Sequence, residues 1–201
     1  MKYLRRIMPE LLAAILLITV YTAQAAGNIG WKQLYIDYIN NNPAEMPDYA
    51  EYSLIYIDDD DIPELWIDFG TSYEGMALCT VSDGKLKELR YPAGSFSYLE
   101  RRNLFVIGYG RMDYYHDDVL RIQNGEFIEL HVGEYGAEDN ANVQYDANEE
   151  PIYQYIWKGK KVTKEGYEQS LNSVLNNSKT INARENSCSA REIINRIKRY
   201  E

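Results

Sequence analysis

The stretch MALCTVSDGKLKELRY, from Met76 to Tyr91, predicts a β-hairpin and with it the kind of fold. Two runs of strand-forming residues, Met76–Val81 and Leu86–Tyr91, flank Asp83-Gly84, and Asp-Gly is a favoured pair for the tight turn between antiparallel strands. The same logic applies at Asn124-Gly125, which separates two further strand-like runs. Hairpins that follow one another along the chain predict an antiparallel β-meander.

Segments on both sides of this hairpin also show strand-like or helical patterns. Further strands are expected at residues 53–57, 65–69, 96–99, 104–109, 114–122, 126–132 and 152–157. Helices are expected at Trp31–Asn41, from the cap Thr163 to about Asn176, and after the capping box Ser189–Glu192. The sequence therefore predicts an α+β fold: an antiparallel β-meander sheet with an N-terminal helix and two C-terminal helices. Residues 177–187 are expected to be a linker before the last helix, and Gly133–Pro151 to be a long irregular loop.

The beginning of the chain has the features of a secretory signal peptide. Basic residues come first, an apolar run from Leu11 to Val20 follows, and Ala23-Gln24-Ala25 supplies the small residues that signal peptidase requires. The apolar run is about ten residues long, whereas a membrane span needs roughly twenty. We therefore expect residues 1–25 to be removed, residues 26–201 to form one globular domain, and the protein to be secreted, with no membrane insertion after cleavage.

The chain is acidic, with a formal net charge of −10 over 201 residues. A negative body repels nucleic acid, so we expect no nucleic-acid partner. Acidic residues dominate from Gly27 to Trp157, whereas Lys and Arg outnumber Asp and Glu from Lys158 onward. Two interpretations follow: a basic C-terminal segment that packs against an acidic sheet, or an acidic surface that docks a cationic partner.

The chain has two cysteines, Cys79 and Cys188. In an oxidising compartment they are candidates for a disulfide that ties the last helix to the sheet. The alternative is that both are small apolar side chains of the core.

An acidic turn, YIDDDDIPE from Tyr56 to Glu64, has the spacing of a short calcium loop. Such loops place alternate carboxylates, one backbone carbonyl and a final acid around a hard cation. The register that uses the final acid takes as ligands Asp58, Asp60, the carbonyl of Ile62 and Glu64. Tyr56 and Asp61 depart from the pattern, where a carboxylate and a glycine are expected. The alternatives are neutralisation by a basic segment of the same chain, such as the C-terminal one, or a solvated turn with no partner.

This turn lies within a segment that resembles a known pattern. The stretch YSLIYIDDDDIPEL, from Tyr52 to Leu65, is similar to the segment YALxDIDGDGIPEL of poorly characterised secreted proteins from Gram-positive, often gut-dwelling bacteria. The stretch from Tyr155 to Tyr167 resembles a second motif of these proteins, YxWxGKxV[ST]xExY. The resemblance implies a secreted domain of unknown function, with calcium as the cofactor in members that keep the acidic pattern.

Tyrosine is abundant, with 19 residues, and several lie close to the expected loop Gly133–Pro151. Tyrosine offers an apolar ring and a polar tip, which suits both sugar stacking and protein contacts. We predict a ligand surface formed by Tyr114, Tyr115, Tyr135 and Tyr145. The alternative is that these tyrosines only pack over half-buried faces of the sheet.

Motifs of known enzyme classes do not emerge from the sequence. His131-Val-Gly-Glu134 lacks the second histidine of a zinc hydrolase, and Gly108-Tyr-Gly110 lacks the third glycine of a dinucleotide loop. We therefore expect a non-catalytic extracellular binding module for a protein or a glycan, with calcium as the only candidate cofactor. Two alternatives remain open: an extracellular hydrolase that uses a pair of carboxylates, and an inhibitor of a cationic enzyme.

Overall fold

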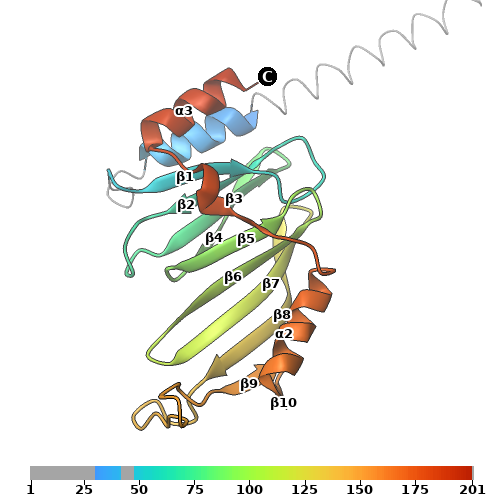
Figure 1. The fold of residues 1–201 in the computed structure, drawn as a ribbon. Coiled ribbons are helices and arrows are strands. Elements are labelled where there is room, and N and C mark those ends of the chain that lie inside the picture. The colour runs from blue at the N-terminus through green and yellow to red at the C-terminus, as the bar shows by residue number, and fades with distance from the viewer. Residues whose placement is uncertain (1–29, 42–47, 201) are drawn as a thin grey trace, which may run out of the picture.

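The computed structural model describes residues 30–41 and 48–200, and they form an α+β structure (Figure 1). The predicted signal peptide, residues 1–25, lies outside the described residues. All strand pairs are antiparallel, and the strands are divided between two sheets. The predicted fold class is confirmed, and the division into two sheets is the feature that the sequence did not predict.

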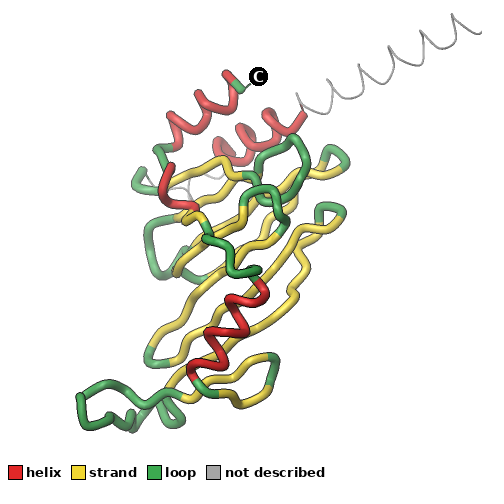
Figure 2. Tube along the Cα trace, turned by 45° about the vertical axis from the view of Figure 1, so that its right-hand side comes forward, coloured by secondary structure: helices red, strands yellow, loops and turns green. Residues whose placement is uncertain are grey.

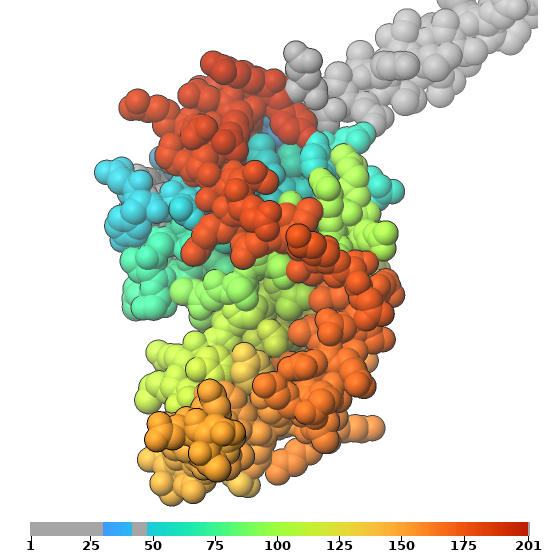
Figure 3. All heavy atoms as spheres, viewed as in Figure 1, coloured from blue at the N-terminus to red at the C-terminus, as the bar shows by residue number. Residues whose placement is uncertain are grey.

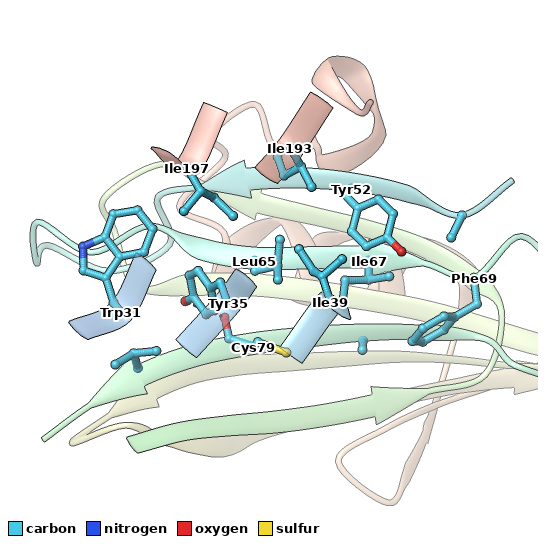
Figure 4. Packing of buried hydrophobic residues seen from close by; sticks show 13 residues of the cluster. Trp31, Tyr35, Ile39, Tyr52, Leu65, Ile67, Phe69, Cys79, Ile193 and Ile197 are labelled. Atoms are coloured by element: carbon cyan, nitrogen blue, oxygen red, sulfur yellow. Dashed lines mark hydrogen bonds between the residues drawn. The ribbon is translucent and has the colours of Figure 1, made fainter. Parts of the chain in front are cut away.

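The first sheet has four strands in the order β1-β2-β3-β4. Its strands are β1 (Glu51–Ile55), β2 (Glu64–Asp68), β3 (Met76–Ser82) and β4 (Lys85–Tyr91). The N-terminal helix, residues 30–41, and α3 (Ala190–Arg199) lie side by side on one face of this sheet (Figure 1). Figure 4 shows the core between them, where Trp31 and Tyr35 of the first helix and Ile193 of α3 point toward the strands. All three side chains are almost completely buried.

The second sheet has seven strands in the order β10-β9-β8-β7-β6-β5-β11. Its strands are β5 (Gly94–Leu99), β6 (Leu104–Arg111), β7 (Tyr114–Gln123), β8 (Glu126–Gly136), β9 (Gln154–Trp157), β10 (Lys160–Val162) and β11 (Ile181–Asn182). The helix α2 (Lys164–Val174) runs along one face of this sheet (Figure 2). Tyr167 of α2 packs there against Val119 and Trp157.

The two sheets pack face to face over part of their length, so the molecule has four layers. Trp66 and Leu78 of the four-stranded sheet share a core with Phe105 and Ile107 of the seven-stranded sheet. This layering explains why β2 is buried at every position instead of alternating between buried and exposed side chains. A strand in a middle layer has no solvent-facing side. The seven-stranded sheet continues beyond the region that the other sheet covers, and both clefts described below border this free portion.

The predicted turns and caps are confirmed. Asp83 and Gly84 both have positive φ angles, 52° and 68°, as a type I′ hairpin turn requires. The side chain of Thr163 accepts a hydrogen bond from the Gly166 amide and caps α2. Ser189 caps α3 through the amide of Glu192.

The segment 177–187 differs from the predicted linker because it forms secondary structure. It contains β11, which pairs with β5, and the short 3-10 helix η1 (Ala183–Asn186). Arg184 of η1 forms ion pairs with Glu51, at 3.4 Å, and with Asp68. This part of the basic C-terminal segment therefore packs against acidic residues of the four-stranded sheet, which is the first of the two interpretations of the charge asymmetry.

The predicted disulfide is not formed, since Cys79 and Cys188 are both free thiols. The backbone of Cys188 exchanges two 2.9 Å hydrogen bonds with Tyr52 of β1, whereas Cys79 lies on β3, beyond β2. Three interstrand spacings of about 4.8 Å each separate the two residues, while a disulfide joins Cα atoms within about 7 Å of one another. Cys79 is buried in the core and Cys188 packs against the same cluster, as the alternative interpretation expected.

Candidate functional site

A cleft of about 1120 Å³ opens where the two sheets part, between the β2–β3 loop and the β6–β7 hairpin. We call it the aromatic cleft. Figure 3 shows it as an indentation on the left side of the molecule. It is lined by Ser72, Tyr73, Arg90, Tyr91, Pro92, Ala93, Tyr109, Gly110, Arg111, Met112, Tyr114, His116 and Asn140. Residues from both sheets and their loops meet here, although the outermost two, Ser72 and Asn140, are 68 positions apart in the chain.

The aromatic rings of the cleft form a continuous series. The rings of Tyr109 and His116 stack with centroids 4.7 Å apart and an interplanar angle of 5°. Tyr91 meets Tyr109 edge to face at 5.3 Å, and Tyr114 meets His116 edge to face at 4.9 Å. Aromatic pairs prefer these offset and edge-on geometries, so each ring supports the orientation of its neighbour.

Hydrogen bonds to two carboxylates fix the phenol groups of this series. The hydroxyl of Tyr109 donates to Oδ2 of Asp118 at 3.1 Å, and the hydroxyl of Tyr114 donates to Oε2 of Glu134 at 2.8 Å. Burial raises the pKa of Tyr109 to about 12, and the charge of Asp118 adds to the rise. Burial and the charge of Asp118 also raise the pKa of Tyr91. These phenols therefore stay protonated at ordinary pH, and the rings are already in place before a ligand arrives.

The rim of the cleft exposes large apolar side chains. Tyr73 is 98% exposed, Met112 76% and Tyr114 40%. Met112 and Asp113 form the tip of the β6–β7 hairpin with φ angles of 54° and 59°. Non-glycine residues enter this left-handed region at a cost of about 1 kcal/mol each. Local strain and exposed apolar surface at the same place are typical of binding sites.

The polar side chains that line the cleft include hydrogen-bond donors and an imidazole, but no carboxylate among the described residues. Arg90 and Arg111 bring two guanidinium groups, and Nδ1 of His116 is buried with no hydrogen-bond partner among the described residues. Within the part of the chain that the structure describes, the residues that line this cleft include no Asp and no Glu. The cleft thus offers ring faces and hydrogen-bond donors, but no carboxylate pair for acid–base chemistry.

The structure does not bring the four tyrosines of the predicted ligand surface together. Adjacent residues on a strand point to opposite faces of the sheet, so Tyr114 lines the aromatic cleft whereas Tyr115 lies on the face that α2 covers. Tyr115 stacks there on Tyr135 at 5.1 Å. Tyr145 lies in the loop after β8 and is 61% exposed. The predicted loop begins later than expected, because β8 continues to Gly136.

Sequence reasoning missed Tyr73, Tyr91 and Met112 as site residues. Tyr73 and Tyr91 belong to the four-stranded sheet and its loops, and only the packing of the two sheets brings them to the β6–β7 hairpin. One local signal was present: a two-residue hairpin turn made of Met112-Asp113, where glycine or asparagine is preferred. Residues that break the local preference of a turn are often part of a functional site.

The acidic turn adopts a compact local structure. Oδ1 of Asp58 accepts the amide hydrogen of Asp60 at 3.1 Å, and Oδ1 of Asp60 accepts that of Ile62 at 2.7 Å. Burial, together with the nearby charge of Asp58, raises the pKa of Asp60 to about 6. Arg101, from the β5–β6 turn, places its guanidinium 4.1 Å from the ring centre of Tyr56 and donates to the carbonyl of Asp60. Among the described residues, the basic group with a hydrogen bond to the turn is therefore Arg101 and not one of the C-terminal segment.

Glu64, the expected final ligand of a calcium loop, is 1% exposed, and its carboxylate forms hydrogen bonds within the protein. Its Oε2 accepts the amide hydrogen of Ile57 at 2.9 Å, and its Oε1 lies 3.3 Å from the hydroxyl of Thr80. Burial raises its pKa to about 8, and the charges of Asp58 and Asp60 contribute. Across residues 30–41 and 48–200, no three His, Cys, Asp or Glu side chains form a group that could hold a metal ion. The geometry does not support a calcium site with Glu64 as ligand, and calcium binding stays a prediction.

Comparison with known proteins gives no match to a family model, to a curated protein or to a solved structure. Among the described residues, no helix is long and apolar enough to cross a bilayer. The evidence for function therefore comes from the sequence and from the two faces of the seven-stranded sheet.

Proposed function

We propose that this protein is a secreted, non-catalytic binding module whose ligand, a glycan, occupies the aromatic cleft. The observation that carries the proposal is the preorganised series of rings from Tyr91 to Tyr114 beside a rim of exposed apolar side chains. Monomeric proteins seldom expose several large apolar side chains around one concave surface unless that surface binds something.

A glycan fits the chemistry of this cleft better than a purely apolar ligand. Sugar rings present flat C–H faces that pack on aromatic rings, and their hydroxyl groups accept hydrogen bonds from guanidinium, imidazole and amide donors. Arg111, His116 and Asn140 supply such donors next to the rings. The volume of about 1120 Å³ is sufficient for an oligosaccharide rather than a single small molecule.

The lining residues that the structure describes carry no carboxylate, which favours binding over hydrolysis at this cleft. Glycoside hydrolysis by the common route needs two carboxyl groups that flank the scissile bond. Asp118 and Glu134 accept hydrogen bonds from the phenols of Tyr109 and Tyr114 and so support the wall of the cleft instead. The hydrolase alternative would need a pair of acids elsewhere in the molecule.

The test is a binding screen of the mature protein against a panel of purified soluble polysaccharides, followed by calorimetry of each hit. Tyr73→Ala should weaken binding at least about fivefold, which corresponds to the loss of about 1 kcal/mol or more that marks the aromatic residues most important for binding. Tyr145→Ala is the matched control, since Tyr145 is also an exposed tyrosine but does not line the cleft. Equal loss in both variants, or none in Tyr73→Ala, would refute the assignment of the site.

A further inference from the structure

A second cleft, of about 920 Å³, lies on the opposite face of the seven-stranded sheet. It is bounded by α2, by the ends of β8 and β9, and by the loop after β8, which Figure 2 shows beyond the lower end of α2. Four acidic residues line it: Asp117, Asp146, Glu150 and Glu168. The only basic residue among the described residues of its lining is Lys164, so we call it the acidic cleft.

A row of tyrosines forms the floor of the acidic cleft. Tyr135 and Tyr155, direct cross-strand neighbours on β8 and β9, line the cleft, and Tyr115, opposite Tyr135 on β7, continues the row beyond the lining. The ring of Tyr135 stacks on that of Tyr115 at 5.1 Å and on that of Tyr155 at 5.6 Å. Tyr167 of α2 meets both Tyr135 and Tyr155 at inclined angles and encloses one side. The result is a rigid aromatic surface with acids around it.

Asp117 brings a negative charge to a largely enclosed position beside this surface. Its Oδ2 accepts a 2.7 Å hydrogen bond from the hydroxyl of Tyr167. Burial raises the pKa of Asp117, and the charge of Asp118, the next residue on the strand, raises it further. A cation in the cleft would relieve the unfavourable charge on this side of the sheet.

Within this chain, arginine side chains stack on aromatic rings close to acidic groups. The guanidinium of Arg101 stacks over Tyr56, with 4.1 Å between the guanidinium carbon and the ring centre, beside the acidic turn. Arg90 lies over Phe69 at 4.9 Å while it pairs with Glu88. A planar guanidinium can stack on a ring and donate paired hydrogen bonds to carboxylates at the same time, which an ammonium group cannot do.

We propose that the acidic cleft binds an arginine side chain presented by a basic protein partner. The acids around the tyrosine floor would receive the guanidinium, and the negative charge of the chain, −10, would attract a basic surface. A protein is favoured over free arginine because the wall of the cleft exposes apolar surface that a small cation would leave uncovered. Ile152, which lines the cleft, is 53% exposed. This site is separate from the aromatic cleft, so it does not depend on the proposed glycan ligand.

The test uses two capped tripeptides, acetyl-Gly-Arg-Gly-amide and acetyl-Gly-citrulline-Gly-amide, titrated into the full mature protein at low salt. Citrulline has nearly the shape of arginine but carries no charge, so the pair isolates the guanidinium charge. The arginine peptide should shift amide resonances of β8, β9 and α2, with a dissociation constant near or below about 10 mM. The citrulline peptide should bind at least tenfold more weakly.

Charge-removing variants locate the site. Glu150→Gln and Glu168→Gln, both at exposed positions, should each weaken binding of the arginine peptide about 1.5- to 5-fold, as expected for exposed ion pairs. Glu165→Gln is the matched control, because Glu165 is exposed on the same helix but does not line the cleft. The proposal is overturned by equal binding of the two peptides, by resonance shifts confined to other regions, or by equal effects of the three variants. Tighter binding of free L-arginine than of the capped peptide would identify a small-molecule site and overturn the protein partner.

Discussion

Glu64→Gln should remove most of the pH dependence of stability that the acidic turn confers. In the folded protein the pKa of Glu64 is about 8, compared with 4.5 for an unperturbed glutamate, mainly because burial disfavours the charged form. The unfolded chain therefore loses this proton at a lower pH than the folded one. As pH rises from about 4.5 to about 8, the free energy of unfolding should fall.

The size of the effect follows from the shift in pKa. Each unit corresponds to about 1.4 kcal/mol, so the shift to about 8 sets an upper limit of about 5 kcal/mol on the stability lost across the window. Glutamine reproduces the protonated form: its carbonyl oxygen accepts from the amide of Ile57 and its NH₂ group donates to the hydroxyl of Thr80. The variant and the wild type should therefore be similarly stable at pH 4, and the variant should be more stable at pH 8.5.

Urea unfolding at several pH values between 4 and 9, in the presence of a chelator, measures both curves. Asp59→Asn is the control, because Asp59 is exposed on the same turn and its replacement should change the free energy of unfolding by no more than about 0.5 kcal/mol. A difference between Glu64→Gln and wild type that stays constant with pH would refute the reasoning. So would a wild-type protein whose stability rises between pH 5 and pH 8.

Three other predictions concern the hairpin tip, the acidic turn and the thiols. Met112→Asn should raise Tm by about 2–4 °C, because asparagine tolerates the left-handed conformation (φ 54°) better than methionine. The same substitution should weaken ligand binding at the aromatic cleft. An unchanged or lower Tm would contradict the assignment of strain. If calcium binds the acidic turn, millimolar Ca²⁺ should raise Tm in the wild type but not in Asp60→Ala, and a wild type that does not respond removes the calcium hypothesis. The unreduced, unfolded protein should show two titratable thiols, from Cys79 and Cys188, whereas none would mean that a disulfide forms.

Local features of the fold were well predicted because they depend on neighbouring residues. The Asp83-Gly84 turn, the strands on both sides of it and the caps at Thr163 and Ser189 all form as expected. Each depends on backbone preferences or hydrogen bonds within a few residues. The segment 177–187 was misjudged because β11 is only two residues long and exists through its pairing with β5.

The candidate sites were predicted less well because they depend on which strands share a face. The sequence pointed to the tyrosines near the loop after β8, and Tyr135 does belong to the floor of the acidic cleft. The separation of Tyr114 from Tyr115 follows from the alternation of side chains along a strand. The sequence could not show that Tyr73 lines the same cleft as Tyr114, because Tyr73 comes from a loop of the other sheet.

The order of most elements, the positions of most turns and the α+β class follow from the sequence alone, because propensities and turn chemistry act over short distances. Three features arise only in the folded molecule: the strands divide into two packed sheets, Glu64 is buried, and Cys79 and Cys188 lie too far apart to bond. These outcomes depend on long-range packing. The hydrophobic effect that drives it is non-directional, so many arrangements of the same strands bury similar apolar area, and the fit of side chains in the assembled core selects one of them.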